Sequence, residues 1–418
     1  MAKKKGILIL CNLDTRGKEI AFVKDMIEAR GHRGIFMDFS MEEPPPFSGD
    51  ITCEQVAETG GLPIEKVRDY YHTKRDVAMD NQIKGATAVT LELFNKGEID
   101  GVVGLGGGTG AVVSTSVMHK LPFGVPKLMI THMASMPQYI KGLVGPHDVT
   151  MHHTVLDMGR VNPLLKAQII NGIGAICGMV EATQGAKIVT DKPLVAVSVF
   201  SPSEMATQMA MKHLEEAGFI PVPCSAAGIG DAAMESMIRD GLFSGVLDIS
   251  IGGVVEYMFD GNRNPGPGRL TAAAETGIPQ VLAPSGLDHL SYGSRPDKEE
   301  LIKSRKHFVM DKLRIQVRTT AEELVQAADV IAERLNKAKG PWVFLIPMQG
   351  WSSIDREGRD CYDPEADAAF VKEFKAKINN KEAVKEVDMH LYTPEFARLV
   401  VDEFLKLYNE YRGSKESK

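Results

Sequence analysis

A glycine-rich segment constrains this chain more than any other part of its sequence. Five of the seven residues from Gly104 to Gly110 are glycine, and the apolar run Gly101–Val103 precedes them. A helical pattern follows from Ala111 to Lys120. This order of strand, glycine loop and helix exposes backbone N–H groups to a ligand, and it directs the partially positive N-terminus of the helix toward that ligand. The segment therefore predicts an α/β fold with an anion site.

Phosphate is the anion that such a loop most often binds. We expect the backbone N–H groups of the loop to hold it, with the hydroxyl of Thr109 as a further donor. The predicted contacts are Gly104, Gly106, Gly107, Gly108, Thr109 and Gly110. No lysine follows them as in a P-loop, and their spacing fits the dinucleotide pattern G-x-G-x-x-G only loosely. The alternative is a tight turn that packs the helix on the strand.

The composition is that of a soluble globular protein with more than one domain. The 418 residues exceed what one ordinary hydrophobic core supports, and 44% of them are hydrophobic and 25% charged. A net charge of -7 argues against nucleic acid or an acidic membrane surface as the main partner. We expect no membrane span, because no run reaches the required length of about 18 apolar residues. Five scattered cysteines without a C-x-x-C pair indicate a reducing cytoplasm.

The first half of the sequence predicts a parallel sheet with helices. An apolar strand is expected at Gly6–Cys11, and a helix from Lys18 to about Arg30. The turn between them lies at the carboxyl end of the first strand, where α/β sheets bind ligands. Thr15 and Arg16 are in this turn, and an arginine fork suits phosphate. The alternative is that Asp14 or Thr15 only caps the helix.

Two further turns are expected at the same edge of this sheet. The predicted second strand, Gly34–Asp38, ends in an acidic residue, which is the usual partner of a ribose hydroxyl. A turn that starts at this Asp before Ser40 is the alternative. The predicted fourth strand, Val125–Ile130, ends in a turn of mostly small residues from Thr131 to Ser135.

A second α/β unit is expected after residue 189. The segment Asp191–Pro193 precedes a new apolar strand, Leu194–Phe200, and strands, small-residue turns and helices then alternate again. We therefore predict two Rossmann-like, doubly wound domains with mainly parallel sheets. Residues 1–189 would form the nucleotide-binding domain, and residues 190–418 a domain with a substrate crevice.

The loops of the second sheet would gather the side chains of a candidate catalytic site. They are Asp248, Glu256, Arg269, Ser285, Asp288 and His307. Acids, a base and a hydroxyl are what a catalytic site needs, although any α/β sheet gathers polar residues at its loop edge. Asp248, Asp288 and His307 are the candidates for binding or activating an acceptor. No metal site is expected at His152 and His153, because a strand would direct them to opposite faces.

Five segments occur in an order known from one protein family. They are Asn12–Glu19, Gly104–Gly110, Asp157–Asn162, Pro284–Asp288, and Gly350–Asp355 with Asp363–Glu365. From Gly6 to about Arg398 the chain resembles the ATP-binding family typified by the tomato mosaic virus resistance protein. The resemblance implies two Rossmann-like halves, ATP in the N-terminal half and a homodimer. Most members have no established activity, so it implies a ligand more than a reaction.

The resemblance also implies which residues contact the nucleotide. By position, Asp14, Thr15 and Arg16 join the glycine loop as nucleotide contacts. Asp38 would hold the ribose, and Thr131 and Ser135 would be further contacts.

The leading hypothesis is a cytoplasmic ATP-binding protein. As an enzyme, it would transfer a phosphoryl or nucleotidyl group to a small polar metabolite, with Mg²⁺ bridging the phosphates. One alternative is a nucleotide-gated regulatory protein without turnover. Another is an NAD-dependent oxidoreductase, in which the glycine loop would follow the first strand rather than the third.

Overall fold

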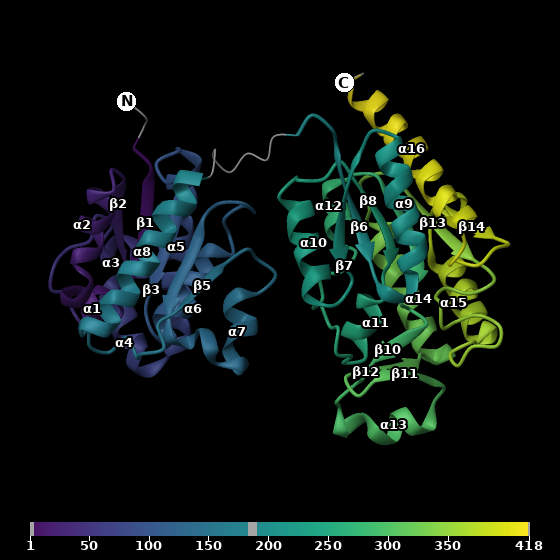
Figure 1. Cartoon of the computed structure of the whole chain (residues 1–418), viewed down its shortest axis with the longest axis horizontal. Coiled ribbons are helices and arrows are strands. Elements are labelled where there is room, and N and C mark those ends of the chain that lie inside the picture. The colour runs from purple at the N-terminus through teal and green to yellow at the C-terminus, as the bar shows by residue number, and fades with distance from the viewer. Residues whose placement is uncertain (1–3, 183–189, 417–418) are drawn as a thin grey trace. The chain divides into compact units, whose positions relative to one another are not determined.

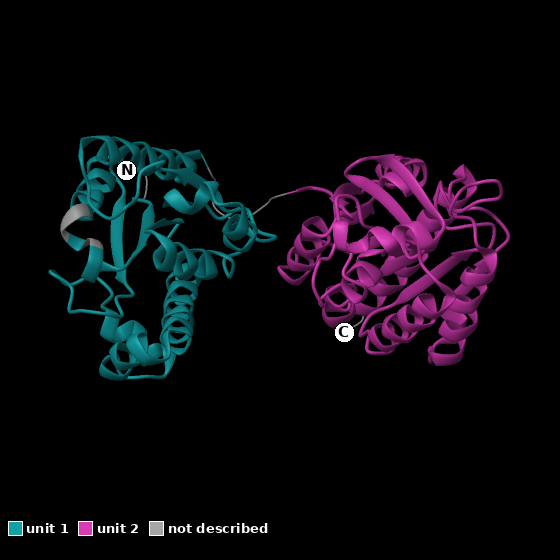
Figure 2. Cartoon of the chain, turned by 90° about the horizontal axis from the view of Figure 1, so that it is seen from below, with its two compact units in different colours: residues 1–189 teal, residues 190–418 magenta. Residues whose placement is uncertain are grey.

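The computed structural model describes residues 4–182 and 190–416, apart from the side chains of residues 16, 18, 19 and 416. The chain divides into two compact units, residues 1–189 and 190–418 (Figure 2). Each unit is built on a parallel sheet that carries helices on both faces (Figure 1). The predicted fold class, two Rossmann-like α/β units with mainly parallel sheets, is confirmed.

The first unit contains a five-stranded parallel sheet in the order β2-β1-β3-β4-β5. Its strands are β1 (Gly6–Cys11), β2 (Arg33–Asp38), β3 (Gly101–Leu105), β4 (Lys127–Thr131) and β5 (Thr150–His153). Its helices are α1 (Leu13–Ile20), α2 (Phe22–Ala29), α3 (Cys53–Gly60), α4 (Ile64–Thr73), α5 (Arg75–Asn95), α6 (Gly108–Met118), α7 (Pro137–Val144) and α8 (Pro163–Ala182). A 3₁₀ turn, η1 (His132–Ser135), follows β4.

Strand β1 shows why this sheet is covered on both faces. All of its residues are buried. Ile7 and Ile9 pack in a cluster with α2 and α8, whereas Leu8 and Leu10 pack in a cluster with α3, α4, α5 and α6. A strand that is buried on both faces needs a continuous apolar run instead of an alternating pattern. This is why the sequence located β1 correctly.

Helix α8 bears on the expectation that the chain has no membrane span. Within the described part of the chain, it is the one helix long and apolar enough to cross a membrane. A count of consecutive apolar residues missed it because polar and glycine residues such as Asn171 and Gly172 interrupt the run. Leu165, Ile169 and Ile173 on one side of the helix are buried against the sheet. Packing in the core thus accounts for this apolar stripe.

The second unit contains a six-stranded parallel sheet in the order β14-β13-β9-β8-β6-β7 and a three-stranded antiparallel sheet in the order β10-β12-β11. The strands of the large sheet are β6 (Leu194–Val199), β7 (Ile220–Ser225), β8 (Gly245–Ser250), β9 (Gln280–Ser285), β13 (Trp342–Pro347) and β14 (Val384–Val387). Those of the small sheet are β10 (His289–Ser291), β11 (His307–Asp311) and β12 (Arg314–Arg318).

The helices of the second unit cover both faces of its large sheet. They are α9 (Glu204–Glu216), α10 (Ile229–Arg239), α11 (Gly253–Met258), α12 (Ala272–Thr276), α13 (Glu299–Ser304), α14 (Ala321–Asn336), α15 (Pro364–Lys377) and α16 (Pro394–Glu416). Helices α9 and α16 pack on one face, and α10, α11, α12, α14 and α15 pack on the other. Helix α13 and the small sheet lie together at one end of this unit (Figure 1).

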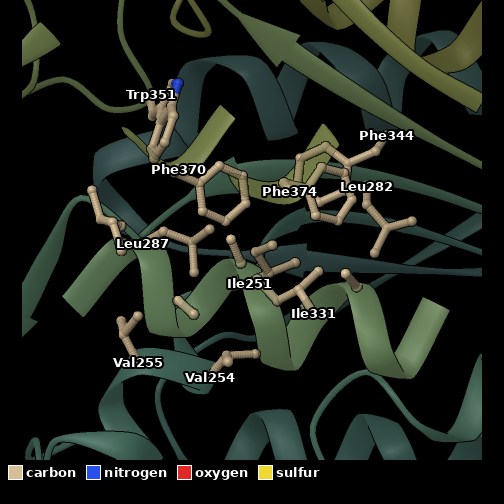
Figure 3. Close-up of a cluster of buried hydrophobic side chains, with 14 of the residues drawn as sticks. Ile251, Val254, Val255, Leu282, Leu287, Ile331, Phe344, Trp351, Phe370 and Phe374 are labelled. Atoms are coloured by element: carbon tan, nitrogen blue, oxygen red, sulfur yellow. The ribbon is translucent and has the colours of Figure 1, made fainter. Parts of the chain in front are cut away.

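An aromatic cluster forms the core under α14 and α15. Figure 3 shows Phe370 and Phe374 of α15 beside Phe344 of β13, with Trp351 next to Phe370. The ring centroid of Phe374 lies 4.9 Å from that of Phe344 and 5.5 Å from that of Phe370. Rings at these distances bury a large apolar area and attract each other through their edges and faces. This cluster therefore fixes α15 on the sheet.

Replacing Phe374 by alanine should destabilise the second unit by about 3–5 kcal/mol, because it leaves a cavity in a dense core. Both tryptophans, Trp342 and Trp351, lie in this unit, so their fluorescence during urea unfolding measures its stability. Phe123→Ala is the matched control, because Phe123 lies in the first unit and is 40% exposed. A loss of less than about 1 kcal/mol in Phe374→Ala would contradict the role given to this cluster.

Candidate functional site

The first unit has a crevice between β1 and β3. These strands are neighbours in the sheet, but the chain leaves them toward opposite faces. After β1 it enters α1 and α2, which pack in the cluster of Ile7 and Ile9. After β3 it enters α6, whose Val113 and Val117 pack in the cluster on the other face. Diverging connections of this kind leave room for a ligand at the carboxyl ends of the strands.

The crevice holds a cavity of about 180 Å³. Its wall is formed by Asn12, Asp14, Thr15, Met41, Glu42, Tyr71, Gly107, Gly108, Thr109 and Gly110. The structure thus brings together two groups of predicted contacts, the turn after β1 and the glycine loop after β3. Glu42 and Tyr71 also line the cavity, and sequence reasoning did not single them out.

The glycines of the loop serve two different purposes. A Cβ atom at Gly104 would lie 2.6 Å from the Cβ of Ser114 in α6, and one at Gly106 would lie 2.8 Å from the Cα of Gly110. Close packing of α6 on β3 therefore requires these glycines, as the alternative interpretation expected. A Cβ atom at Gly108 would have no neighbour within 4 Å. Packing does not require a glycine there, and the backbone at Gly108 borders open space.

Helix α6 begins at this cavity without a cap. Its N-cap residue is Gly107, which has no side chain that accepts a hydrogen bond, and its first turn carries no acidic residue. The N–H of Ala111 bonds to the carbonyl of Gly107 at 2.7 Å. The N–H groups of Gly108, Thr109 and Gly110 precede this first helical bond and are left for a ligand or water. The helix dipole adds partial positive charge at the same place.

Arg75 supplies a cation that the glycine loop itself lacks. Its Nη2 donates to the hydroxyl of Thr109 at 3.2 Å and to the hydroxyl of Tyr71 at 2.6 Å. Its guanidinium also lies 4.3 Å from the centroid of the Tyr71 ring. Sequence reasoning missed Arg75, because the surrounding polar residues suggest an exposed helix face. The break at Lys74, between α4 and α5, is the local signal that marks this position.

Asp14 holds the loop after β2 against the cavity. Helix α1 begins at Leu13 and not at Lys18 as expected, so Asp14 lies in its first turn. The Oδ2 of Asp14 accepts hydrogen bonds from the N–H groups of Met41, Glu42 and Glu43 at 3.3, 3.0 and 3.4 Å. The amide of Asn12 donates to the hydroxyl of Thr15. The side chain of Arg16 lies outside the described residues.

Asp38 lies behind the cavity wall instead of lining it. Its carboxyl is fully buried, and its Oδ1 accepts the N–H groups of Leu13 and Ser40, each at 3.0 Å. Burial raises the pKa of this carboxyl above its ordinary value. Asp38 thus connects the end of β2 to the start of α1. Its position agrees with the turn-forming alternative and gives no support to the ribose contact.

The two contacts expected after β4 also lie outside the cavity wall. Thr131 is buried, and its hydroxyl accepts the N–H of Met133 at 3.1 Å. Ser135 ends the 3₁₀ turn η1. Neither is among the residues that line the cavity. Thr131 therefore shapes the turn at the neighbouring strand end.

In the second unit, Asp248 belongs to a buried ion cluster. It shares Arg269 with Asp231 and Glu235, and all four side chains are buried. Arg269 Nε donates to the carboxylate of Asp231 at 2.7 Å, and Arg269 Nη1 donates to that of Asp248 at 2.6 Å. Burial raises the pKa of Asp231 to about 6. Both carboxylate oxygens of Asp248 therefore accept hydrogen bonds from Arg269.

Asp288 and His307 have different partners from Asp248. The Asp288 carboxylate bonds to His289 Nδ1 at 2.8 Å and to the Ser352 hydroxyl at 2.6 Å. His307 lies on β11 of the small sheet, and its Nδ1 is 2.9 Å from the carbonyl of Arg305. The three candidates thus take part in three separate sets of contacts. Sequence reasoning did not single out His289, which follows Asp288 directly.

Comparisons with known proteins give a family for the whole chain. The model of the uncharacterised protein family UPF0261 N-terminal domain matches residues 5–185, and that of the C-terminal domain matches residues 192–408. A UPF0261 protein of Clostridium tetani is 34% identical over 94% of this chain and 96% of its own length.

A plant protein and one solved structure are also similar. The ToMV resistance protein Tm-1(GCR237) of Solanum lycopersicum is 30% identical over 86% of this chain. The match covers 46% of that protein, so this chain spans about half of it. A putative UDP-N-acetylglucosamine 2-epimerase from Listeria monocytogenes is 11% identical, with a TM-score of 0.22, over 93% of this chain and 100% of that one.

Replacing Arg269 by methionine should destabilise the second unit by about 3–5 kcal/mol, because it leaves three buried carboxyl groups without their cation. The loss should be larger at about pH 8 than at about pH 5, because burial raises the pKa values of Asp231 and Glu235 and their protonation at the lower pH reduces the unpaired charge. Urea unfolding followed by tryptophan fluorescence measures both. Arg314→Met, which breaks the exposed pair with Asp311, is the control and should change little. An equal loss at both pH values would contradict the ion-cluster account.

Proposed function

The chain belongs to the UPF0261 family, and we propose that its first unit binds ATP in the crevice between β1 and β3. One observation carries the proposal. The uncapped N-terminus of α6 meets the cavity at Gly108, where the backbone borders open space, and Arg75 lies at Thr109. Free N–H groups, a helix dipole and a guanidinium together favour a polyphosphate. ATP is the phosphate ligand that the sequence resemblance implies.

We propose that this nucleotide serves phosphoryl or nucleotidyl transfer to a small polar metabolite in the cytoplasm, and that the protein is a homodimer. The five cysteines are buried free thiols, which agrees with a reducing compartment. The position of Asp38 weakens the oxidoreductase alternative, because that alternative depends on an acidic partner for the ribose. Regulation without turnover uses the same nucleotide site.

Magnesium fits this site as a companion of the nucleotide. Within residues 4–182 and 190–416, no group of three or more His, Cys, Asp or Glu side chains forms a metal site. Mg²⁺ needs fewer protein ligands when phosphates supply the others, and one or two carboxylates are usual. Asp14 and Glu42 line the cavity opposite the glycine loop. Asp14 is held by backbone N–H groups, so we assign the ion to Glu42, whose carboxylate lies beside the Tyr71 hydroxyl.

Two variants test the nucleotide site. Gly108→Val should abolish ATP binding without unfolding the chain, because its side chain enters open space in the cavity. Arg75→Gln should weaken binding about 10- to 100-fold, because it removes charge-assisted hydrogen bonds to a phosphate. Calorimetric titration with ATP measures both, and Lys66→Gln on the exposed side of α4 is the control. Wild-type affinity in Gly108→Val would remove the glycine loop from the site. Phosphorus NMR of the same samples then shows whether ATP is turned over.

Glu42→Gln should remove most of the gain in ATP affinity that Mg²⁺ provides, while affinity without Mg²⁺ stays the same or rises. The reason is that the amide cannot supply the negative charge that the ion prefers. Glu43→Gln is a matched control, because the Glu43 side chain is exposed and does not line the cavity. Titrations with ATP in the presence and absence of Mg²⁺ give two affinities for each protein. An unchanged magnesium effect in Glu42→Gln would contradict this assignment.

A further inference from the structure

A buried histidine at the carboxyl edge of the second sheet has one unused nitrogen. His289 begins β10, and its side chain is fully buried. Its Nδ1 lies 2.8 Å from the Oδ2 of Asp288. Because a carboxylate only accepts hydrogen bonds, Nδ1 carries a hydrogen, and in the neutral imidazole Nε2 is then an acceptor. Among the described residues, Nε2 has no hydrogen-bond partner.

The surrounding residues hold this histidine in a fixed orientation. The Ser352 hydroxyl donates to the Oδ2 of Asp288 at 2.6 Å, and the N–H of Gly286 donates to its Oδ1 at 3.0 Å. Arg318 Nη1 donates to the carbonyl of Asp288 at 2.9 Å. Burial alone would raise the pKa of Asp288, but His289, Arg318 and Ser352 hold it below its ordinary value. Asp288 is therefore an ionised anchor for the imidazole.

Two of the five segments that carry the family resemblance contact each other around His289. Pro284–Asp288 supplies the carboxylate, and Gly350–Asp355 supplies the serine that bonds to it. Within the first segment, the hydroxyl of Ser285 is also buried and lacks a partner among the described residues. The chain from β9 into β10 thus presents two unused polar atoms, Ser285 Oγ and His289 Nε2, and the segment after β13 bonds to the carboxylate beside His289.

Phe200 covers this position. Its ring is stacked on the imidazole of His289, with centroids 5.5 Å apart and planes 21° apart. A Cβ atom at Gly286 would lie 4.0 Å from the Phe200 ring. The ring is only partly buried, and the guanidinium of Arg263 lies 4.1 Å from its centroid. The ring of Phe200, the residue after β6, therefore covers one face of the His289 imidazole.

Unused buried acceptors and hydroxyls destabilise a fold, and apolar side chains would fill the same space without this cost. We propose that His289 and Ser285 form a second ligand site that takes a small, neutral, polyhydroxylated molecule. One ligand hydroxyl donates to His289 Nε2, and another bonds to Ser285 Oγ. The Phe200 ring moves aside and packs against the C–H groups of the ligand. His307, on another strand, takes no part.

This site goes beyond the nucleotide site and does not depend on it. Diethyl pyrocarbonate tests it, because the reagent acylates neutral imidazole nitrogens and peptide mass spectrometry locates each product. The full-length chain is treated near neutral pH without nucleotide. The exposed His153 serves as the internal reference for reagent activity. Phe200→Ala removes the covering ring, Phe123→Ala controls for loss of a phenylalanine elsewhere, and glycerol, ribitol and inositol are the probe ligands.

We expect slow modification of His289 in the wild-type chain, several-fold faster modification in Phe200→Ala, and no change in Phe123→Ala. At least one polyol should slow the reaction of His289 saturably without slowing that of His153. If His289 stays unmodified in both the wild-type chain and Phe200→Ala while His153 reacts, it is a core residue and the proposal fails. Modification that none of the polyols slows would refute the assigned ligand class. His289→Asn retains a donor to Asp288, and it should abolish polyol binding measured by calorimetry while the chain remains folded.

Discussion

The close approach of α6 to β3 is the constraint on which the first unit depends. A Cβ atom at Gly106 would come within 2.8 Å of the Cα of Gly110, so any side chain there would push the helix away from the sheet. The same approach starts α6 inside the crevice with a glycine at its N-cap. Free N–H groups therefore face the cavity as a consequence of packing. The packing of α6 on β3 thus also places the N–H groups that could bind an anion. Packing does not require a glycine at Gly108, so a substitution there can test anion binding without disturbing the fold.

The second unit has the same strand topology but closes its crevice. Its first and third strands, β6 and β8, are joined at their carboxyl ends by the hydroxyls of Ser203 and Ser250, 2.7 Å apart. A Cβ atom at Gly252 would lie 2.4 Å from the carbonyl oxygen of Gly286, so the loops after β8 and β9 are in direct contact. At the carboxyl edge of this sheet, paired hydroxyls and contacts between loops take the place that free backbone N–H groups have in the first unit. Shared topology therefore does not give the two units shared chemistry.

The sequence predicts those features that depend on local pattern. Buried strands such as Gly6–Cys11 are continuous apolar runs, and the glycine loop marks its own position. The approach of Arg75 to Thr109 depends on where α4 and α5 lie on the sheet, and no spacing encodes that. The surroundings of an acidic residue are not encoded locally either. Asp38 ends a strand as a ribose partner would, but it lies behind the cavity wall, where its Oδ1 accepts the N–H groups of Leu13 and Ser40.

Unused hydrogen-bonding capacity identifies candidate sites better than residue type. Asp14 and Asp248 carry the charge that ligand chemistry needs, but each is bound by N–H groups or by a guanidinium of its own unit. A carboxylate in such contacts stabilises the fold, and a ligand would have to displace them. The uncapped N-terminus of α6 and the Nε2 of His289 have the opposite property, because the fold orients them and leaves them free. Preorganised groups without partners are those that a ligand can use at little cost to the fold.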